Sequence, residues 1–152
     1  MTGQLLRAAA LASLLVAGNL ATADQGERTD NAETVVTGQL RGTWVAVSME
    51  RAGKNELPPN NRELVFTFDA AKVKVTEGMH TEEMSYQHRE AKTPWEIDLT
   101  EVKGGPQGLT IKGIYRIDGD TLKLSFSIGG TRPTTFTSKD QESGVITFKR
   151  KK

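Results

Sequence analysis

Turn-forming residues recur every eight to twelve residues from Leu40 to the end of the chain, with short apolar–polar alternations between them. This spacing is typical of an antiparallel meander, in which consecutive strands are neighbours. The strongest hairpin signal is Asp118-Gly119 within 117–121, because this dipeptide favours the backbone of a two-residue turn. The predicted strands are 44–49, 64–69, 72–76, 81–88, 95–100, 109–117, 121–127, 134–137 and 145–149.

A sheet of eight or nine strands with one apolar face has to bury that face. Closure into a barrel covers the face and removes both exposed edges, although an open sandwich would use the same alternation. We therefore predict an all-β fold, an antiparallel up-and-down barrel over residues 38–152. The residues expected to point inward are Leu64, Phe66, Phe68, Val73, Val75, Met84, Tyr86, Ile97, Leu99, Ile111, Tyr115, Leu122, Leu124 and Phe126.

The first predicted strand opens with Gly42-Thr43-Trp44, which resembles the Gly-x-Trp start of lipocalin-type barrels. Several stretches resemble, in the same order, an uncharacterised lipocalin-like domain family of planctomycete bacteria: 40–44, 94–100, 113–124, 132–136 and 148–150. The resemblance implies a small exported or envelope-associated barrel, and it brings no activity, ligand or catalytic residue with it. It also implies that Gly42 and Trp44 lie at the closed end of the barrel, with Trp44 in contact with Lys149 or Arg150.

Residues 1–23 have the composition of a secretory signal peptide. Arg7 is their only charge, 8–18 form an apolar run, and Ala21-Thr22-Ala23 supplies the small-x-small cleavage sequence. The run is shorter than the roughly 20 apolar residues that a membrane span needs. We expect cleavage after this peptide, a flexible polar leader over 24–37, and a periplasmic or extracellular protein without a membrane span.

Charge and cysteine content narrow the function classes. The chain has 20 Lys and Arg against 19 Asp and Glu, and one of the basic residues belongs to the signal peptide. A balanced chain gives no electrostatic reason to expect a nucleic acid or an anionic membrane as partner, and the basic end 149–152 is expected to be solvated. The lack of cysteine excludes disulfides, thiolate nucleophiles and cysteine metal ligands.

Three functions from different classes remain open for such a barrel. Eight strands enclose an interior that either is filled by side chains or holds one small ligand. An open interior favours a carrier of a small apolar or amphipathic molecule, and a filled interior favours an interaction or inhibitor module that binds another exported protein through its loops. An enzyme is the least favoured, since no nucleophile motif or phosphate loop is present, and no cofactor is predicted. The predicted ligand-binding residues are Phe66, Met84, Tyr86, His88, Tyr115, Phe126 and Arg132.

One predicted strand carries six residues of the same parity, whose side chains point the same way. They are His80, Glu82, Met84, Tyr86, His88 and Glu90. His80 and His88 are eight residues apart, about 26 Å along an extended strand, so they cannot share an ion unless the strand turns. We predict no metal site, and either a role of His88 at a pocket mouth or two solvated strand ends.

Two residues outside this strand have competing interpretations. Arg132 is either a carboxylate anchor at the rim or, as we favour, the structural partner of an acid such as Asp98 or Glu96. Trp95 either contacts a ligand at the rim or, as we favour, caps the core.

Overall fold

The computed structural model describes residues 38–56, 62–104 and 108–152. The predicted signal peptide and leader therefore lie outside the described residues. Within these ranges the protein is all-β, and nine strands alternate with turns. The strands are β1 (Gly42–Arg51), β2 (Lys54–Asn55), β3 (Leu64–Phe68), β4 (Lys72–Glu77), β5 (His80–Arg89), β6 (Trp95–Lys103), β7 (Thr110–Asp118), β8 (Thr121–Ser127) and β9 (Ser143–Arg150).

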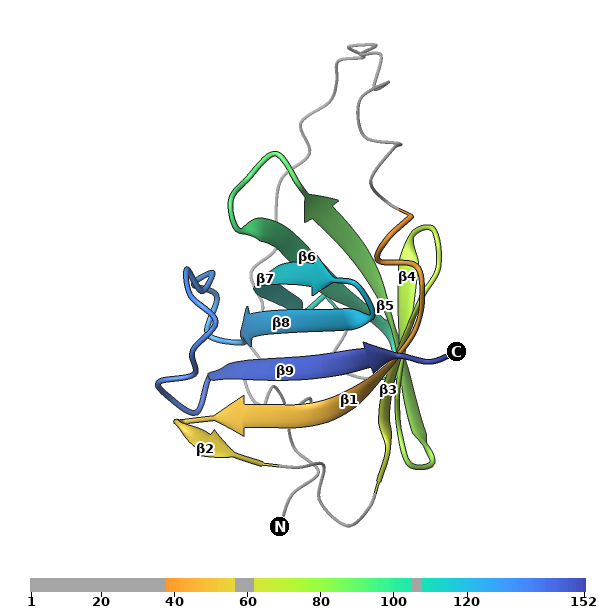
Figure 1. Cartoon of the computed structure of the whole chain (residues 1–152), viewed down its shortest axis with the longest axis horizontal. Coiled ribbons are helices and arrows are strands. Elements are labelled where there is room, and N and C mark those ends of the chain that lie inside the picture. The colour runs from red at the N-terminus through yellow and green to blue at the C-terminus, as the bar shows by residue number, and fades with distance from the viewer. Residues whose placement is uncertain (1–37, 57–61, 105–107) are drawn as a thin grey trace, which may run out of the picture.

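The sheet closes on itself. Each strand from β3 to β9 pairs antiparallel with the next, and β1 pairs with both β3 and β9 (Figure 1). The short strand β2 pairs with the end of β1, so the other eight of the nine strands form the barrel. The predicted up-and-down barrel is thus confirmed, including the hairpin in which Asp118 pairs with Thr121.

Alternation along the strands fills the barrel interior. In β4, Val73 and Val75 are buried while Lys72 and Lys74 are exposed, as the period of a half-buried strand requires. All fourteen residues predicted to point inward belong to the single hydrophobic core cluster. Core residues that the prediction omitted come from β1, β9 and the turn before β1: Leu40, Trp44, Met49, Ile146 and Phe148.

The barrel end that holds Trp44 is sealed by a cation over an indole. The Arg150 guanidinium carbon lies 4.0 Å from the centroid of the fully buried Trp44 ring, and Trp44 Nε1 donates to the carbonyl of Leu40 at 2.8 Å. A side chain at Gly42 would meet Arg150 Nη1 at 3.0 Å, and the φ of 118° there also favours glycine. The expected contact is confirmed for Arg150, whereas Lys149 is exposed and donates to Thr121 Oγ1 at 2.6 Å.

The segment between β8 and β9 runs along the outside of the barrel instead of forming the strand predicted at 134–137. That prediction was wrong, because β8 and β9 pair with each other and with β7 and β1, which leaves no free edge beside this segment. Three outward-facing residues in one row are buried nevertheless, and they form a small patch apart from the main core: Ile114, Ser125 and Val145.

Among the described residues, no helix is long and apolar enough to cross a membrane.

Candidate functional site

The two ends of the barrel differ in the side chains that point inward. The closed end, around Trp44, is mostly apolar and aromatic, and the polar side chains His88 and Glu90 at the end of β5 are bound to Tyr115. At the other end, formed by the end of β1 and the starts of β5 and β9, the inward positions include Arg51, Glu82 and Glu101. We call this the open end; in Figure 1 it is the side where β1 meets β2, away from the C-terminus. Charged side chains seldom point into a core without a partner, so the open end is the candidate site.

A bulge in β1 decides the direction of Arg51. The register shifts after Ala46, so that Met49 lies opposite Ile146 and Arg51 opposite Gly144. Residues directly opposite each other share one face of a sheet, and both Met49 and Ile146 belong to the core. Arg51 therefore points into the barrel, one step nearer the open end than Met49.

The guanidinium of Arg51 keeps one edge free. Its Nε and Nη2 atoms are buried and have no hydrogen-bond partner within the described ranges. These two atoms form the edge with which arginine holds a carboxylate through two parallel hydrogen bonds. A buried donor without a partner costs about 1–3 kcal/mol, so the free edge calls for an explanation.

Two carboxylates point inward on the strands across the barrel from Arg51. Glu82 of β5 is 3% exposed; its Oε1 lies 3.0 Å from Nε2 of the half-exposed His80, while its Oε2 is buried without a partner in the described part of the chain. Glu101 of the adjacent β6 is 4% exposed and lies opposite Met84. The open end therefore presents both a cation and carboxylates to its interior.

Five of the seven predicted ligand-binding residues lie inside the barrel, and they are 1–8% exposed: Phe66, Met84, Tyr86, Tyr115 and Phe126. Three of them, Phe66, Tyr86 and Tyr115, belong to a row of rings whose neighbouring centroids are 4.9–6.4 Å apart: Phe148, Phe66, Phe68, Tyr86, His88, Tyr115 and Trp95. Side chains that lined a wide lumen would keep more accessible surface than these do. The described interior is therefore largely filled by side chains, and a ligand-binding role of these five residues stays a prediction.

His88 joins a polar group inside this aromatic row. Tyr115 Oη donates to Glu90 Oε1 at 2.8 Å and lies 3.1 Å from His88 Nδ1. Burial, and then the hydrogen bond to Glu90, raises the pKa of Tyr115 above its usual value, so the phenol stays protonated. His88 and Glu90 are mostly buried at 14% and 12% side-chain exposure, which corrects the interpretation of His88 as a solvated strand end, whereas His80 is half-exposed.

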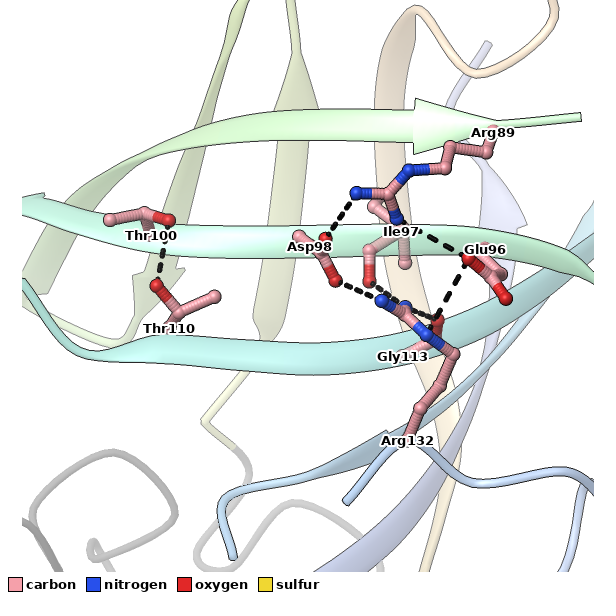
Figure 2. A network of polar contacts seen from close by, with 8 residues as sticks. All are labelled: Arg89, Glu96, Ile97, Asp98, Thr100, Thr110, Gly113 and Arg132. Carbon is pink, nitrogen blue, oxygen red and sulfur yellow. Dashed lines mark hydrogen bonds and ion pairs between the residues drawn. The ribbon is translucent and has the colours of Figure 1, made fainter. Parts of the chain in front are cut away.

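The structure places Arg132 on the outside of the barrel (Figure 2). It donates through Nη1 to the carbonyls of Ile97 and Gly113 at 3.1 and 2.8 Å, and through Nη2 to Asp98 Oδ1 at 2.6 Å. Asp98 alternates with the core residue Ile97 and so faces outward, between Arg132 and Arg89. Burial acts to raise the pKa of Asp98, but the hydrogen bonds from these two arginines hold it below its usual value.

The favoured interpretation of Arg132, a structural ion pair with Asp98, is therefore confirmed. The structure does not bring Arg132 together with the inward-facing aromatic residues. The favoured interpretation of Trp95 is confirmed as well, since this partly buried residue packs on the core with its ring 5.5 Å from that of Tyr115.

Sequence reasoning missed Arg51 as an inward residue. Strict alternation from Trp44 would turn Arg51 outward, and the bulge that reverses it has no clear sequence signal. Glu82 was correctly placed on the inner face of its strand, but its lack of a second partner depends on the strands around it.

Within the described residues, no group of three or more His, Asp or Glu side chains is arranged to hold a metal ion. The expectation that the protein is not an enzyme stays a prediction.

Comparison of the chain with family models, with curated proteins and with solved structures gave no significant match. The fold is therefore established by the structure, and membership of the planctomycete family stays a prediction.

Proposed function

We propose that this protein is an exported barrel that binds a small amphipathic molecule at its open end. One observation carries the proposal: buried atoms of Arg51 and Glu82 without hydrogen-bond partners face the interior at that end. Native proteins rarely leave such atoms unsatisfied, and a bound polar group would satisfy them. The apolar part of the ligand would contact the adjacent core residues.

The filled interior limits how deep the molecule reaches. Below Arg51, toward the closed end, Met49 and Ile146 are almost fully buried. A long acyl chain would have to displace packed side chains. Protein interiors are packed as densely as organic crystals, so this displacement is costly. The ligand that fits is therefore small, with a polar group at the open end and a short apolar body.

Two measurements test the proposal. Native mass spectrometry of the protein purified gently from its own host should show a bound small molecule. The measured protein mass should match a chain that begins at Asp24 if the signal peptide is removed as expected. In parallel, ligand-observed NMR should detect saturable binding of at least one of three matched probes, hexanoate, hexanol and hexylamine. Native protein without any bound molecule, together with no binding of any probe, would refute the proposal.

The filled core also favours a second candidate, an interaction module that binds another exported protein through its loops. Met79, at the tip of the hairpin between β4 and β5, is 105% exposed, and Val102 near the end of β6 is 41% exposed. Exposed apolar residues near one end are a common feature of protein contacts. A protein that co-purifies with the wild type and is lost with Met79→Ser would support this candidate, and unchanged co-purification would count against it.

A further inference from the structure

We propose that the ligand is a small organic acid and that Arg51 holds its carboxylate in a two-point hydrogen bond. This inference deepens the proposed function and depends on it. It begins from the free edge of the guanidinium, where Nε and Nη2 are both buried and both without partners in the described structure. A carboxylate is the group whose two oxygens match this edge.

Two further arginines are partly buried among the described residues, and they show how this chain uses a structural guanidinium. Arg150 donates from Nη1 and Nη2 to two carbonyls, those of Arg41 and Gln39, at 2.7 Å each. Arg132 uses Nη1 and Nη2 in hydrogen bonds, and its Nε lies 3.6 Å from Glu96 Oε2. Arg51 differs, because the edge best suited to an anion is the one left open.

The surroundings of Arg51 indicate the rest of the molecule. Gly144 lies directly opposite Arg51, and the Phe126 ring lies so close that a Cβ at Gly144 would be 2.5 Å from Phe126 Cζ. An aromatic ring therefore borders the space beside the guanidinium. With Met49 packed below, this arrangement fits a short aliphatic or aromatic acid and excludes a long-chain fatty acid.

Glu82 makes the site selective. Its unpartnered Oε2 is an acceptor that faces the interior from the opposite wall, so a ligand hydroxyl or amine proton pointing there would be favoured. A second carboxylate on the ligand would be repelled by Glu82 and Glu101, since like charges at short range oppose each other. The acid is therefore a monocarboxylate.

The test compares matched probes and matched variants. Hexanoate should bind more tightly than hexanol, and Arg51→Met should weaken hexanoate binding at least about tenfold while leaving hexanol within about twofold. The hexanoate affinity of Arg51→Lys, which keeps the charge but loses the two-point geometry, should lie between those of the wild type and Arg51→Met. Arg62→Met removes an exposed arginine near the same end and serves as the control, with binding unchanged.

A stability measurement separates a ligand-binding arginine from a structural one. Without ligand, Arg51→Met should unfold at the same temperature as the wild type or higher, because the variant removes unsatisfied buried donors. A lower midpoint would mean that Arg51 stabilises the free protein, and would overturn the inference.

The binding data also distinguish failure of the acid assignment from failure of the proposed function. Hexanol or hexylamine binding that exceeds hexanoate binding, and that Arg51→Met leaves unchanged, would overturn the acid assignment while the proposed function stands. The absence of binding by all three probes would overturn both.

A series of acids of increasing length tests the size of the ligand. From butanoate through hexanoate and octanoate to decanoate, the affinity should rise about fourfold per added methylene and then stop rising once the chain meets the packed core. A continued rise through decanoate would refute the short-ligand assignment.

Discussion

Replacement of Trp44 by alanine should bring the barrel close to unfolding. The indole is fully buried, lies under Arg150 and donates to the Leu40 carbonyl, so the variant loses packing, a cation–ring contact and a buried hydrogen bond together. Truncation of a buried large aromatic residue typically costs about 3–5 kcal/mol. Total stabilities of single domains are about 5–15 kcal/mol, and this chain has no disulfide to offset the loss.

Urea unfolding followed by far-ultraviolet circular dichroism measures the effect. With a slope of about 1–2 kcal/mol per molar urea, a loss of about 4 kcal/mol lowers the midpoint by about 2–4 M. Val47→Ala, an exposed position on the same strand, should change stability by less than about 0.5 kcal/mol and is the control. A Trp44→Ala midpoint within about 0.3 M of the wild type would refute the closed-end argument.

Two further variants probe the outer network and the packing beside Arg51. Asp98→Asn should destabilise the protein by about 1–3 kcal/mol near neutral pH. Because hydrogen bonds from Arg132 lower the pKa of Asp98 in the folded state, its contribution is present above the unfolded pKa of about 3.9 and is lost as pH falls through the lower folded value. The gap between the urea midpoints of wild type and variant should therefore shrink as the pH falls below about 4, and an equal gap at neutral and acid pH would contradict the assignment. Gly144→Ala should cost about 1–3 kcal/mol, since its Cβ would lie 2.5 Å from Phe126 Cζ, whereas Gly38→Ala meets nothing within 4 Å. Equal thermal midpoints for the two alanine variants would show that the Phe126 ring moves aside freely.

Most of the barrel could be predicted from the sequence because inward and outward residues alternate regularly along most of its strands. In β3, β4 and β8 the apolar residues alternate without interruption, and each strand is bounded by a turn signal. Alternation fixes which residues are inside, since only one of the two faces can form a core. The closed end followed from a resemblance, and the indole of Trp44 lies where the resemblance placed it.

The remaining features depend on contacts between segments far apart in sequence. Residues 134–137 carry β-forming threonine and phenylalanine, but no strand edge is available to them once β8 and β9 pair. Instead the Phe136 ring lies under Arg116, 5.1 Å from its guanidinium carbon, and Arg132 is bound to the carbonyls of two strands. β-Propensity alone cannot distinguish a strand from an extended segment that lies on the outside of a finished barrel.

Two irregularities of the sheet lie toward the open end, and one of them turns Arg51 inward. One register shift lies between Ala46 and Ser48 of β1, and the other lies where Glu83 and Met84 pair with β6. The first exchanges the strand positions that face inward, so Met49 and Arg51 replace Ser48 and Glu50 there. The second skips Val102 of β6, beyond Glu101, which alternation from Ile97 and Leu99 already turns inward opposite Met84.

β-Bulges are over-represented beside functional sites, where they re-aim side chains at a cost in regular pairing. In this barrel the β1 bulge turns Arg51 inward, where the regular pattern would have left it in solvent, and both bulges lie toward the open end. An inward guanidinium edge without a hydrogen-bond partner costs stability, so the inward turn of Arg51 does not stabilise the free barrel. The bulge beside Arg51 therefore supports the proposal that the open end, and not the aromatic interior, is the ligand-binding site.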